Sequence, residues 1–257
     1  MWDRGTKFIV QYSLLCLASV CALLPAVYLL FKSLQINGST TLLQYETVLL
    51  YTKEFFVWLW NSTKYTLAIL CILIPISVLA GYSFSQFAFR GKRLIFALYL
   101  LLMLLPFQAT VVSQYITLDT MGLLDSEAAI ILPAAMGTFG PFLITQYMKG
   151  IDSEILQAAK LDGAGSVRIL LHIVLPICKP AILSLVILQF INSWSMIDQP
   201  LLFLRREELL PLSLELSSQA FGISAFAAGV LYAIPPVLAY LYCRDALEKG
   251  INLSSVK

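Results

Sequence analysis

Six long stretches without a charged residue constrain the fold of this chain more than any other feature of its sequence. They are Phe8–Phe31, Tyr65–Phe89, Leu94–Leu118, Ala128–Met148, Pro180–Ile197 and Leu216–Cys243. A helix needs about 20 apolar residues to span the roughly 30 Å hydrocarbon core of a bilayer, and each stretch reaches or approaches that length. Strands of a membrane barrel would alternate apolar and polar residues, and these stretches do not. The pattern predicts an all-α polytopic membrane protein with six transmembrane helices.

The predicted spans belong to a single membrane domain that covers residues 1–257. We place them at approximately 8–31, 62–86, 94–116, 128–149, 173–197 and 218–243. Only 12% of the residues are charged and 59% are hydrophobic, whereas soluble domains carry about 25% charged residues. The chain therefore has too little charge for a water-soluble surface, and its surroundings are expected to be a lipid bilayer. The net charge of +2 gives no reason to expect nucleic acid as a partner.

The first stretch resembles a signal peptide in one respect, because Arg4 and Lys7 precede it. It is longer than the roughly 7–15 apolar residues of a signal core, and no small-x-small cleavage site ends it. The segment Leu17-Ala18-Ser19-Val20-Cys21 is similar to a lipoprotein signal, but Val20 is bulky where a small residue is required. We expect an uncleaved first helix.

The distribution of Lys and Arg predicts the orientation of the spans. Six spans place both termini on the same side as the loops after the second and fourth spans. That side carries the larger set: Arg4, Lys7, Arg90, Lys92, Arg93, Lys149, Lys160, Arg168, Lys179, Arg244, Lys249 and Lys257. The opposite side carries Lys32, Lys53, Lys64, Arg205 and Arg206. Because the more basic side is normally cytoplasmic, both termini are expected in the cytoplasm.

The predicted cytoplasmic loop 150–172 is unusually long and mixed in charge. Asp152 or Ser153 can cap a helix N-terminus, Glu154 in the first turn suits the helix dipole, and Gly163 can end the helix in the left-handed conformation. The apolar residues at helical spacing are Ile155, Leu156, Ala158, Ala159 and Leu161. A second helical stretch begins at Ser166 and continues until Pro176 and Pro180 mark the entry to the fifth span. Two interpretations fit: a helix lying on the lipid headgroups, or a docking element for a cytoplasmic partner.

Several motifs in and around this loop belong together. The loop contains Gln157-Ala158-Ala159 and Asp162-Gly163-Ala164, and the start of the fifth span contains Ile173-x-Leu175-Pro176 and Pro180. Other segments are Asn61-Ser62, Ala80-Gly81-Tyr82, Phe89-Arg90-Gly91-Lys92-Arg93, Met121-Gly122-Leu123, Pro200-Leu201 and Lys249-Gly250-Ile251. Their order along the chain resembles ABC importer permeases with an EAA loop, in the carbohydrate branch that contains the second permease of maltose-like systems.

The resemblance implies a transport subunit without catalytic residues in the inner (cytoplasmic) membrane of a prokaryote. Its expected partners are a second homologous permease, two ATPase subunits and an extracytoplasmic substrate-binding protein. ATP and Mg²⁺ are expected in the ATPase, and no cofactor in this chain, which has no G-x-x-x-x-G-K-[ST] phosphate loop. The residues implied in coupling to the ATPase are Ser153, Glu154, Gln157, Ala158, Ala159, Asp162, Gly163, Ala164, Leu175 and Pro176.

Two positions depart from the family pattern. The first residue of the loop motif is usually Glu, and here it is Gln157. A carboxylate makes charge-assisted bonds to an Arg, whereas an amide makes weaker neutral ones. We expect coupling to survive, because Gln keeps the length and an acceptor oxygen. The family often has Trp-Asn after the fifth span where this chain has Trp194-Ser195, so the substrate chemistry of the family is not transferred to this position.

Polar residues within the spans are candidates for the translocation path, because polar groups are costly in lipid and tend to face the protein interior or water. The candidates are Gln108, Ser113 and Gln114 in the third span and Gln189, Asn192, Ser193 and Trp194 in the fifth. Gln189, Asn192 and Ser193 share one helix face, and the two sets are expected at similar depth. The alternative is ordinary hydrogen bonding between helices.

Other functions compete less well with an importer for sugars or oligosaccharides. An ABC permease for a non-sugar solute fits the same motifs. A stand-alone secondary transporter usually needs an acidic or basic residue in mid-membrane, and the spans lack one. The five cysteines and the single His172 form no metal-ligand pattern, so no metal site is expected, and no Ser-His-Asp set indicates an enzyme.

Overall fold

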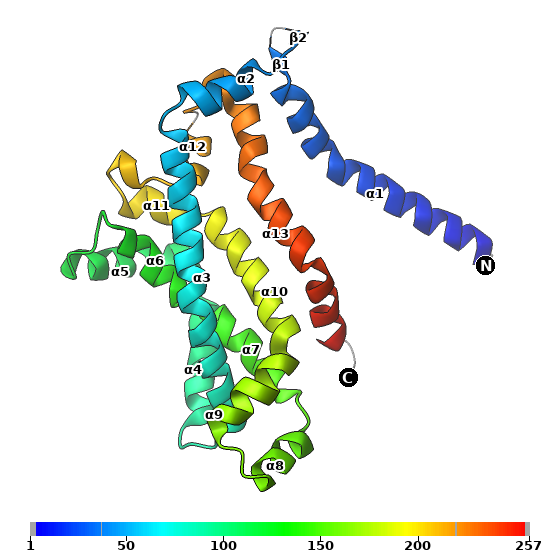
Figure 1. Cartoon of the computed structure of the whole chain (residues 1–257), viewed down its shortest axis with the longest axis vertical. Helices are drawn as coiled ribbons and strands as arrows, with labels where there is room; N and C mark the ends of the chain where they lie inside the picture. The colour runs from blue at the N-terminus through cyan, green and yellow to red at the C-terminus, as the bar shows by residue number, and fades with distance from the viewer. Residues whose placement is uncertain (1–3, 37, 219, 255–257) are drawn as a thin grey trace. The chain divides into compact units, whose positions relative to one another are not determined.

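The computed structural model describes residues 4–36, 38–218 and 220–254, and the surroundings of side chains at 11–36, 38–218 and 220–244. Most of these residues are helical (Figure 1). The α-helices are α1 (Arg4–Ser33), α2 (Leu43–Glu46), α3 (Phe55–Gln86), α4 (Lys92–Met103), α5 (Phe107–Thr120), α6 (Glu127–Ala135), α7 (Phe139–Lys149), α8 (Ser153–Leu161), α9 (Ser166–Ile169), α10 (Leu175–Trp194), α11 (Asp198–Phe203), α12 (Leu212–Ser217) and α13 (Ala225–Ser254). The π-helical turns are η1 (Thr47–Tyr51) and η2 (Leu170–Val174), the 3₁₀ turns are η3 (Glu207–Leu209) and η4 (Gly222–Ser224), and the strands are β1 (Gln35–Ile36) and β2 (Ser39–Thr40).

Five helical segments are long and apolar enough to cross a membrane. Within the described residues they are Gln11–Ser33, Phe55–Gln86, Glu127–Lys149, Ser166–Trp194 and Gly222–Arg244. A sixth candidate is the pair α4 and α5, which bends by 101° at its break. The prediction of an all-α polytopic membrane protein is confirmed, with one short hairpin of two-residue strands besides.

The third predicted span, 94–116, is not one straight helix. Helix α4 ends at Met103, and α5 begins at Phe107 after Pro106, whose backbone is extended with φ −68° and ψ 149°. Proline disfavours helical backbone in the residue before it and donates no backbone hydrogen bond. The chain therefore turns sharply here, and α5 runs in a new direction.

Other helix bounds also differ from the predicted spans. Helix α3 begins at Phe55, ahead of the predicted start at 62, and Ser166–Trp194 is a single helical run where we predicted a span at 173–197. Leu170–Val174 forms a π-turn within that run. Pro176 follows two residues after this turn. In a regular helix its ring would crowd the carbonyl four residues earlier, which lies within the π-turn, so the wider turn fits the sequence.

The chain forms two compact units. The first consists of Met1–Val57 and Glu215–Ile234, and the second of Trp58–Leu214 and Pro235–Lys257. In the first unit the buried Gln44 donates from Nε2 to the carbonyl oxygens of Lys32 and Gln35, both at 2.8 Å. The bond to Lys32 satisfies a backbone acceptor at the C-terminal end of α1, where a helix leaves carbonyls without partners, and the bond to Gln35 holds the start of β1.

In the second unit, α3 and α7 approach each other closely at two glycines. A Cβ added at Gly81 would lie 2.6 Å from Cγ2 of Ile144, and one added at Gly140 would lie 3.1 Å from Cβ of Ser77. Small residues let membrane helices pack backbone to backbone. The buried core beside this contact joins α3, α7, α8, α9 and α10.

A second group of contacts fixes the segment that follows α11. Asn61 Nδ2 donates to the carbonyl oxygens of Glu208 (2.7 Å) and Leu210 (3.1 Å), and Tyr65 Oη donates to that of Leu209 (2.8 Å). Ser62 Oγ accepts from the backbone N–H of Leu212 at 2.9 Å. The Asn61-Ser62 motif therefore has a structural role, because it holds an irregular segment against α3.

Asp125 connects the turn before α6 to the same segment. Its Oδ1 accepts from the backbone N–H groups of Arg205 (2.8 Å) and Arg206 (3.0 Å), and its Oδ2 lies 3.1 Å from Nε of Arg206. These two backbone N–H groups and the guanidinium hold the pKa of the Asp125 carboxyl below its ordinary value. Its φ of 56° is in the left-handed region, which Asp and Asn tolerate better than other non-glycine residues.

We expect Asp125→Asn to lower the melting temperature at neutral pH and to have less effect in acid. A carboxyl whose pKa is lowered in the folded state stabilises the fold above its unfolded pKa of about 3.9. That stabilisation is lost as the pH falls further, through the folded pKa. Thermal unfolding in detergent at pH 7 and below pH 4 measures the difference. Asp119→Asn is the control, since Asp119 forms no ion pair among the described residues; an equal pH-dependent difference in the control would contradict the assignment.

Candidate functional site

Helix α8 is the most distinctive element of the loop that we singled out in the sequence. Asp152 is its N-cap, and its Oδ1 accepts from the backbone N–H of Glu154 at 3.0 Å. Such a cap satisfies one of the free N–H groups in the first turn. The predicted helix start is present, and Asp152 rather than Ser153 provides the cap.

The C-terminal end of α8 is a Schellman motif. The N–H of Ala164 donates to the carbonyl of Ala159, and that of Gly163 to the carbonyl of Lys160, both at 3.0 Å. Gly163 has φ +81°, a conformation that costs glycine little. This motif places the residue after the glycine, Ala164, beside the residue four positions before the glycine, Ala159. Ala159 and Ala164 accordingly both pack against the core that joins α8 to α3, α7 and α10.

One face of α8 is anchored in that core. Leu156 is 5% exposed and packs in the cluster that includes Met148, Ile169 and Val174. Tyr82 of α3 adds a polar contact, because its Oη donates to the carbonyl of Ser166 at 3.1 Å. Leu175 also packs against this cluster, whereas Pro176 is exposed. The loop is therefore joined firmly to three long helices.

The opposite face of α8 is exposed and forms one stripe. Glu154, Gln157, Ala158 and Leu161 are at positions i, i+3, i+4 and i+7, and all four are exposed. Leu161 is 89% exposed. We call these four residues the exposed stripe. Helices that dock into grooves use anchors at this spacing, and a leucine as exposed as Leu161 contributes little to packing within its own chain.

The residues implied in coupling thus fall into two groups. Ala159, Gly163, Ala164 and Leu175 have positions that the fold itself requires. Glu154, Gln157 and Ala158 lie on the exposed stripe, and Ser153 and Asp162 are exposed at the helix ends. The exposure of Leu161 does not follow from the sequence pattern, in which it is one of several apolar residues at helical spacing.

The translocation-path candidates on α10 are partly brought together. Gln189 Nε2 donates to Ser193 Oγ at 3.1 Å, so these two share a face as predicted. Asn192 is exposed. Trp194 is 2% exposed and stacks on Phe190, with ring centroids 5.7 Å apart.

The candidates of the third predicted span all lie on α5. Gln108 and Ser113 are exposed, and Gln114 donates from Nε2 to Thr110 Oγ1 at 3.1 Å. Helices α5 and α10 are well separated in Figure 1, since α5 turns away at the break before Pro106. The two sets therefore lie on a broken span and on a continuous one, α5 and α10. Among the described residues, no group of three or more His, Cys, Asp or Glu could hold a metal ion.

The loop, its anchored helix and the surrounding spans match a known family. The family described as "Binding-protein-dependent transport system inner membrane component" matches residues 73–253. The chain belongs to this family. It is a transmembrane permease subunit of an ABC importer, a non-catalytic transport subunit that crosses the membrane several times, as the sequence motifs indicated.

The permease has relatives along most of its length. It is 28% identical to the arabinooligosaccharides transport system permease protein AraQ of Bacillus subtilis, over 98% of this chain and 94% of that protein. It is 26% identical to the lactose transport system permease protein LacG of Rhizobium radiobacter, over 99% and 98%. The sn-glycerol-3-phosphate transport system permease protein UgpE of Yersinia pestis is 28% identical over 77% of this chain and 73% of that protein.

The fold of the permease is also that of a solved structure. A chain of a bacterial ABC transporter involved in the import of the acidic polysaccharide alginate superimposes with a TM-score of 0.83. The match covers 96% of this chain and 99% of the other at 23% identity. It establishes the fold of the permease and not its substrate.

Proposed function

We propose that this permease forms half of the translocation path of an ATP-driven importer for a sugar or oligosaccharide. A second homologous permease forms the other half, and two ATPase subunits bind ATP and Mg²⁺ and hydrolyse the nucleotide. An extracytoplasmic binding protein delivers the substrate. Both termini and the loop that contains α8 lie in the cytoplasm of a prokaryotic cell, in agreement with the distribution of Lys and Arg.

The exposed stripe of α8 is the observation that carries this proposal. An apolar side chain such as Leu161 gains free energy when a partner removes it from water, about 1.5–3 kcal/mol for full burial. The flanking Glu154 and Gln157 supply acceptors for hydrogen bonds from a partner. The stripe therefore suits a groove on an ATPase subunit.

The anchored face of α8 supports a role in force transmission. Leu156, Ala159 and Ala164 pack in the same core as residues of α3, α7 and α10. Packed interiors resist deformation, so a displacement of α8 by the ATPase is transmitted to these long helices. A helix lying loosely on the lipid surface would lack this connection.

The carbohydrate substrate is proposed from the relatives whose names specify arabinooligosaccharides and lactose. A second candidate is a small phosphorylated solute, because the relative UgpE is named for sn-glycerol-3-phosphate. Binding measurements on the partner binding protein, with an oligosaccharide and with glycerol phosphate, distinguish the two. Membership of the family argues against a secondary transporter that works alone.

Purification of the complex tests the proposed function. A tag on this chain should bring down a second permease and an ATPase with a phosphate loop, and the complex should hydrolyse ATP when binding protein and substrate are added. A chain that purifies alone and transports without ATP would overturn the proposal.

We expect Gln157→Glu to change substrate-stimulated ATP hydrolysis by less than about threefold, because an exposed amide and carboxylate differ modestly as acceptors. Gln157→Ala is the matched variant, which removes the acceptor and should reduce the rate further. The measurement is ATPase activity of the reconstituted complex. Loss of activity, or a large gain, in Gln157→Glu would contradict the expectation.

If α10 lines the path, Asn192→Ala and Gln189→Ala should each weaken the apparent affinity for substrate by about 3- to 10-fold, the effect of one lost hydrogen bond. Ser184→Ala is the control on the same helix, since its hydroxyl donates to the carbonyl of Pro180 at 2.9 Å and it is not a path candidate; it should leave the affinity unchanged. Transport assays in vesicles provide the measurement. Unchanged affinity and rate in both amide variants would exclude these residues from the path.

A further inference from the structure

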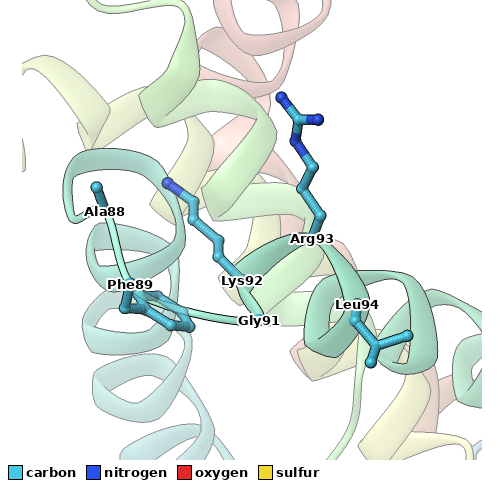
Figure 2. A pocket seen from close by; sticks show the side chains of 6 residues that line it. All are labelled: Ala88, Phe89, Gly91, Lys92, Arg93 and Leu94. Atoms are coloured by element: carbon cyan, nitrogen blue, oxygen red, sulfur yellow. The ribbon is translucent and has the colours of Figure 1, made fainter.

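The turn from α3 to α4 forms a surface that the proposed transport function does not use. A cavity of about 490 Å³ is lined by Ala88, Phe89, Gly91, Lys92, Arg93 and Leu94. Arg90 lies between these residues in the sequence and adds a third cation to the turn. Figure 2 shows the cavity lining, in which the Lys92 and Arg93 side chains extend away from Phe89 and Leu94. The cavity therefore has cationic groups on one side and apolar groups on the other.

The positive charge of this turn has no acidic counterpart among its neighbours in the sequence. The sequence has no Asp or Glu between Glu54 and Asp119. In the part of the chain whose side chains are described, no carboxylate lies within 4.0 Å of the three cations. Lys92 Nζ donates to the carbonyl of Phe87 at 2.8 Å, and Arg90 and Arg93 are exposed. The site therefore favours an anion from outside the chain.

Aromatic rings lie directly beside these cations. Phe84 contacts Phe89, Phe96 and Tyr99, with ring centroids 5.9, 5.3 and 6.5 Å apart. Lys149, at the end of α7, lies 4.7 Å from the centroid of the Phe96 ring and adds a fourth cation. Aromatic and basic side chains together are typical of the depth at which lipid headgroups meet water.

An apolar stripe leads from the cavity along α4. Leu94, which lines the cavity, is followed by Leu98 and Leu101 at i+4 and i+7, and these three are 66%, 51% and 59% exposed. No residue of α4 is buried. At 1.5 Å per residue the stripe is about 10 Å long, enough to contact the upper part of an acyl chain.

We propose that the α3–α4 turn binds an anionic phospholipid, with its phosphate at Arg90, Lys92 and Arg93 and an acyl chain along Leu94, Leu98 and Leu101. A soluble phosphate would use the cations but not the stripe, and a zwitterionic lipid would use the stripe but bring no net charge. Basic pockets beside membrane helices are known to hold such headgroups. The proposal goes beyond transport and requires only that the turn lies at a membrane surface.

Native mass spectrometry of the full-length chain in detergent tests the site. With phosphatidylglycerol and phosphatidylcholine at equal concentration, we expect at least about fivefold more bound phosphatidylglycerol. Arg90→Gln with Arg93→Gln should reduce that binding by about fivefold for each charge removed. Arg90→Lys with Arg93→Lys should retain it, and an unchanged melting temperature shows that each variant is folded.

Two further experiments test whether binding depends on the cations of this turn and on the lipid as a whole. Lys160→Gln with Lys179→Gln removes two exposed cations elsewhere and should leave phosphatidylglycerol binding unchanged. Inorganic phosphate at the same concentration should not displace the lipid. Equal binding of the two lipids, an unaffected Arg90/Arg93 double variant, an equal loss in the Lys160/Lys179 control, or displacement by phosphate alone would each overturn the proposal.

Discussion

Replacing Leu161 by aspartate is expected to reduce substrate-stimulated ATP hydrolysis of the complex by more than about 30-fold, while the chain itself remains folded. The leucine is 89% exposed, so the substitution removes no packing within this chain. At a partner it would lose the burial of a leucine, about 1.5–3 kcal/mol, and would place a charge in an apolar contact, which costs more. Two kcal/mol alone corresponds to about 30-fold.

The controls for this prediction come from the same helix. Leu161→Met keeps an apolar side chain and should retain most of the activity. Leu156→Ala acts on the anchored face and should lower stability by about 2–5 kcal/mol, visible as a lower melting temperature of the chain alone. Leu161→Asp should instead keep the wild-type melting temperature and lose co-purification of the ATPase. Retention of both the ATPase and its stimulation would contradict the docking role of the stripe.

The ends of α8 could be predicted from sequence, but its two faces could not be read from hydropathy. The Asp152 side chain can cap the start of a helix, and Gly163 can adopt the left-handed conformation that ends one. The cap and the left-handed glycine are both found in the structure, as predicted. The apolar residues include both Leu156 and Leu161, and because both are leucines, hydropathy does not distinguish the buried one from the exposed one. The Schellman motif determines which face of α8 is buried. It directs Ala159 and Ala164 toward the core, and Leu161, two residues and about 200° beyond Ala159, must then point away.

The break in the third predicted span shows a different limit. Prolines also occur inside α1, α3, α6, α10 and α13, at Pro25, Pro75, Pro133, Pro180, Pro235 and Pro236, and those helices continue through them. Among the candidate spans of the described residues, only the one that contains Pro106 is divided by a sharp bend, of 101°. Whether a proline bends or breaks a membrane helix depends on which neighbours satisfy the freed backbone groups. Those neighbours are set by tertiary contacts. Hydropathy therefore predicts Gln108, Ser113 and Gln114 in one continuous span, whereas the structure breaks that span before them.

Gly140→Val is expected to destabilise the permease by about 3 kcal/mol or more, because the α3–α7 contact has no room for a side chain. A Cβ at this position would overlap Oγ of Ser77 and would lie 3.2 Å from Cδ2 of Leu73. Valine adds two methyl groups beyond that Cβ. The measurement is the melting temperature and the yield of folded protein in detergent. Gly165→Val is the matched control, since a Cβ at Gly165 has no neighbour within 4 Å.

A double substitution tests whether the steric contact is the cause. Gly140→Ala alone should still destabilise, although alanine is a better helix former than glycine by about 1 kcal/mol. Ser77→Ala removes the overlapping hydroxyl, which is buried without a hydrogen-bond partner among the described residues, and should be close to neutral alone. In the Gly140→Ala/Ser77→Ala variant, the loss caused by Gly140→Ala should therefore become smaller, a coupling that only residues in contact show. Strictly additive effects would mean that Gly140 acts through something other than its contact with Ser77, and the α3–α7 packing that supports α8 would need another explanation.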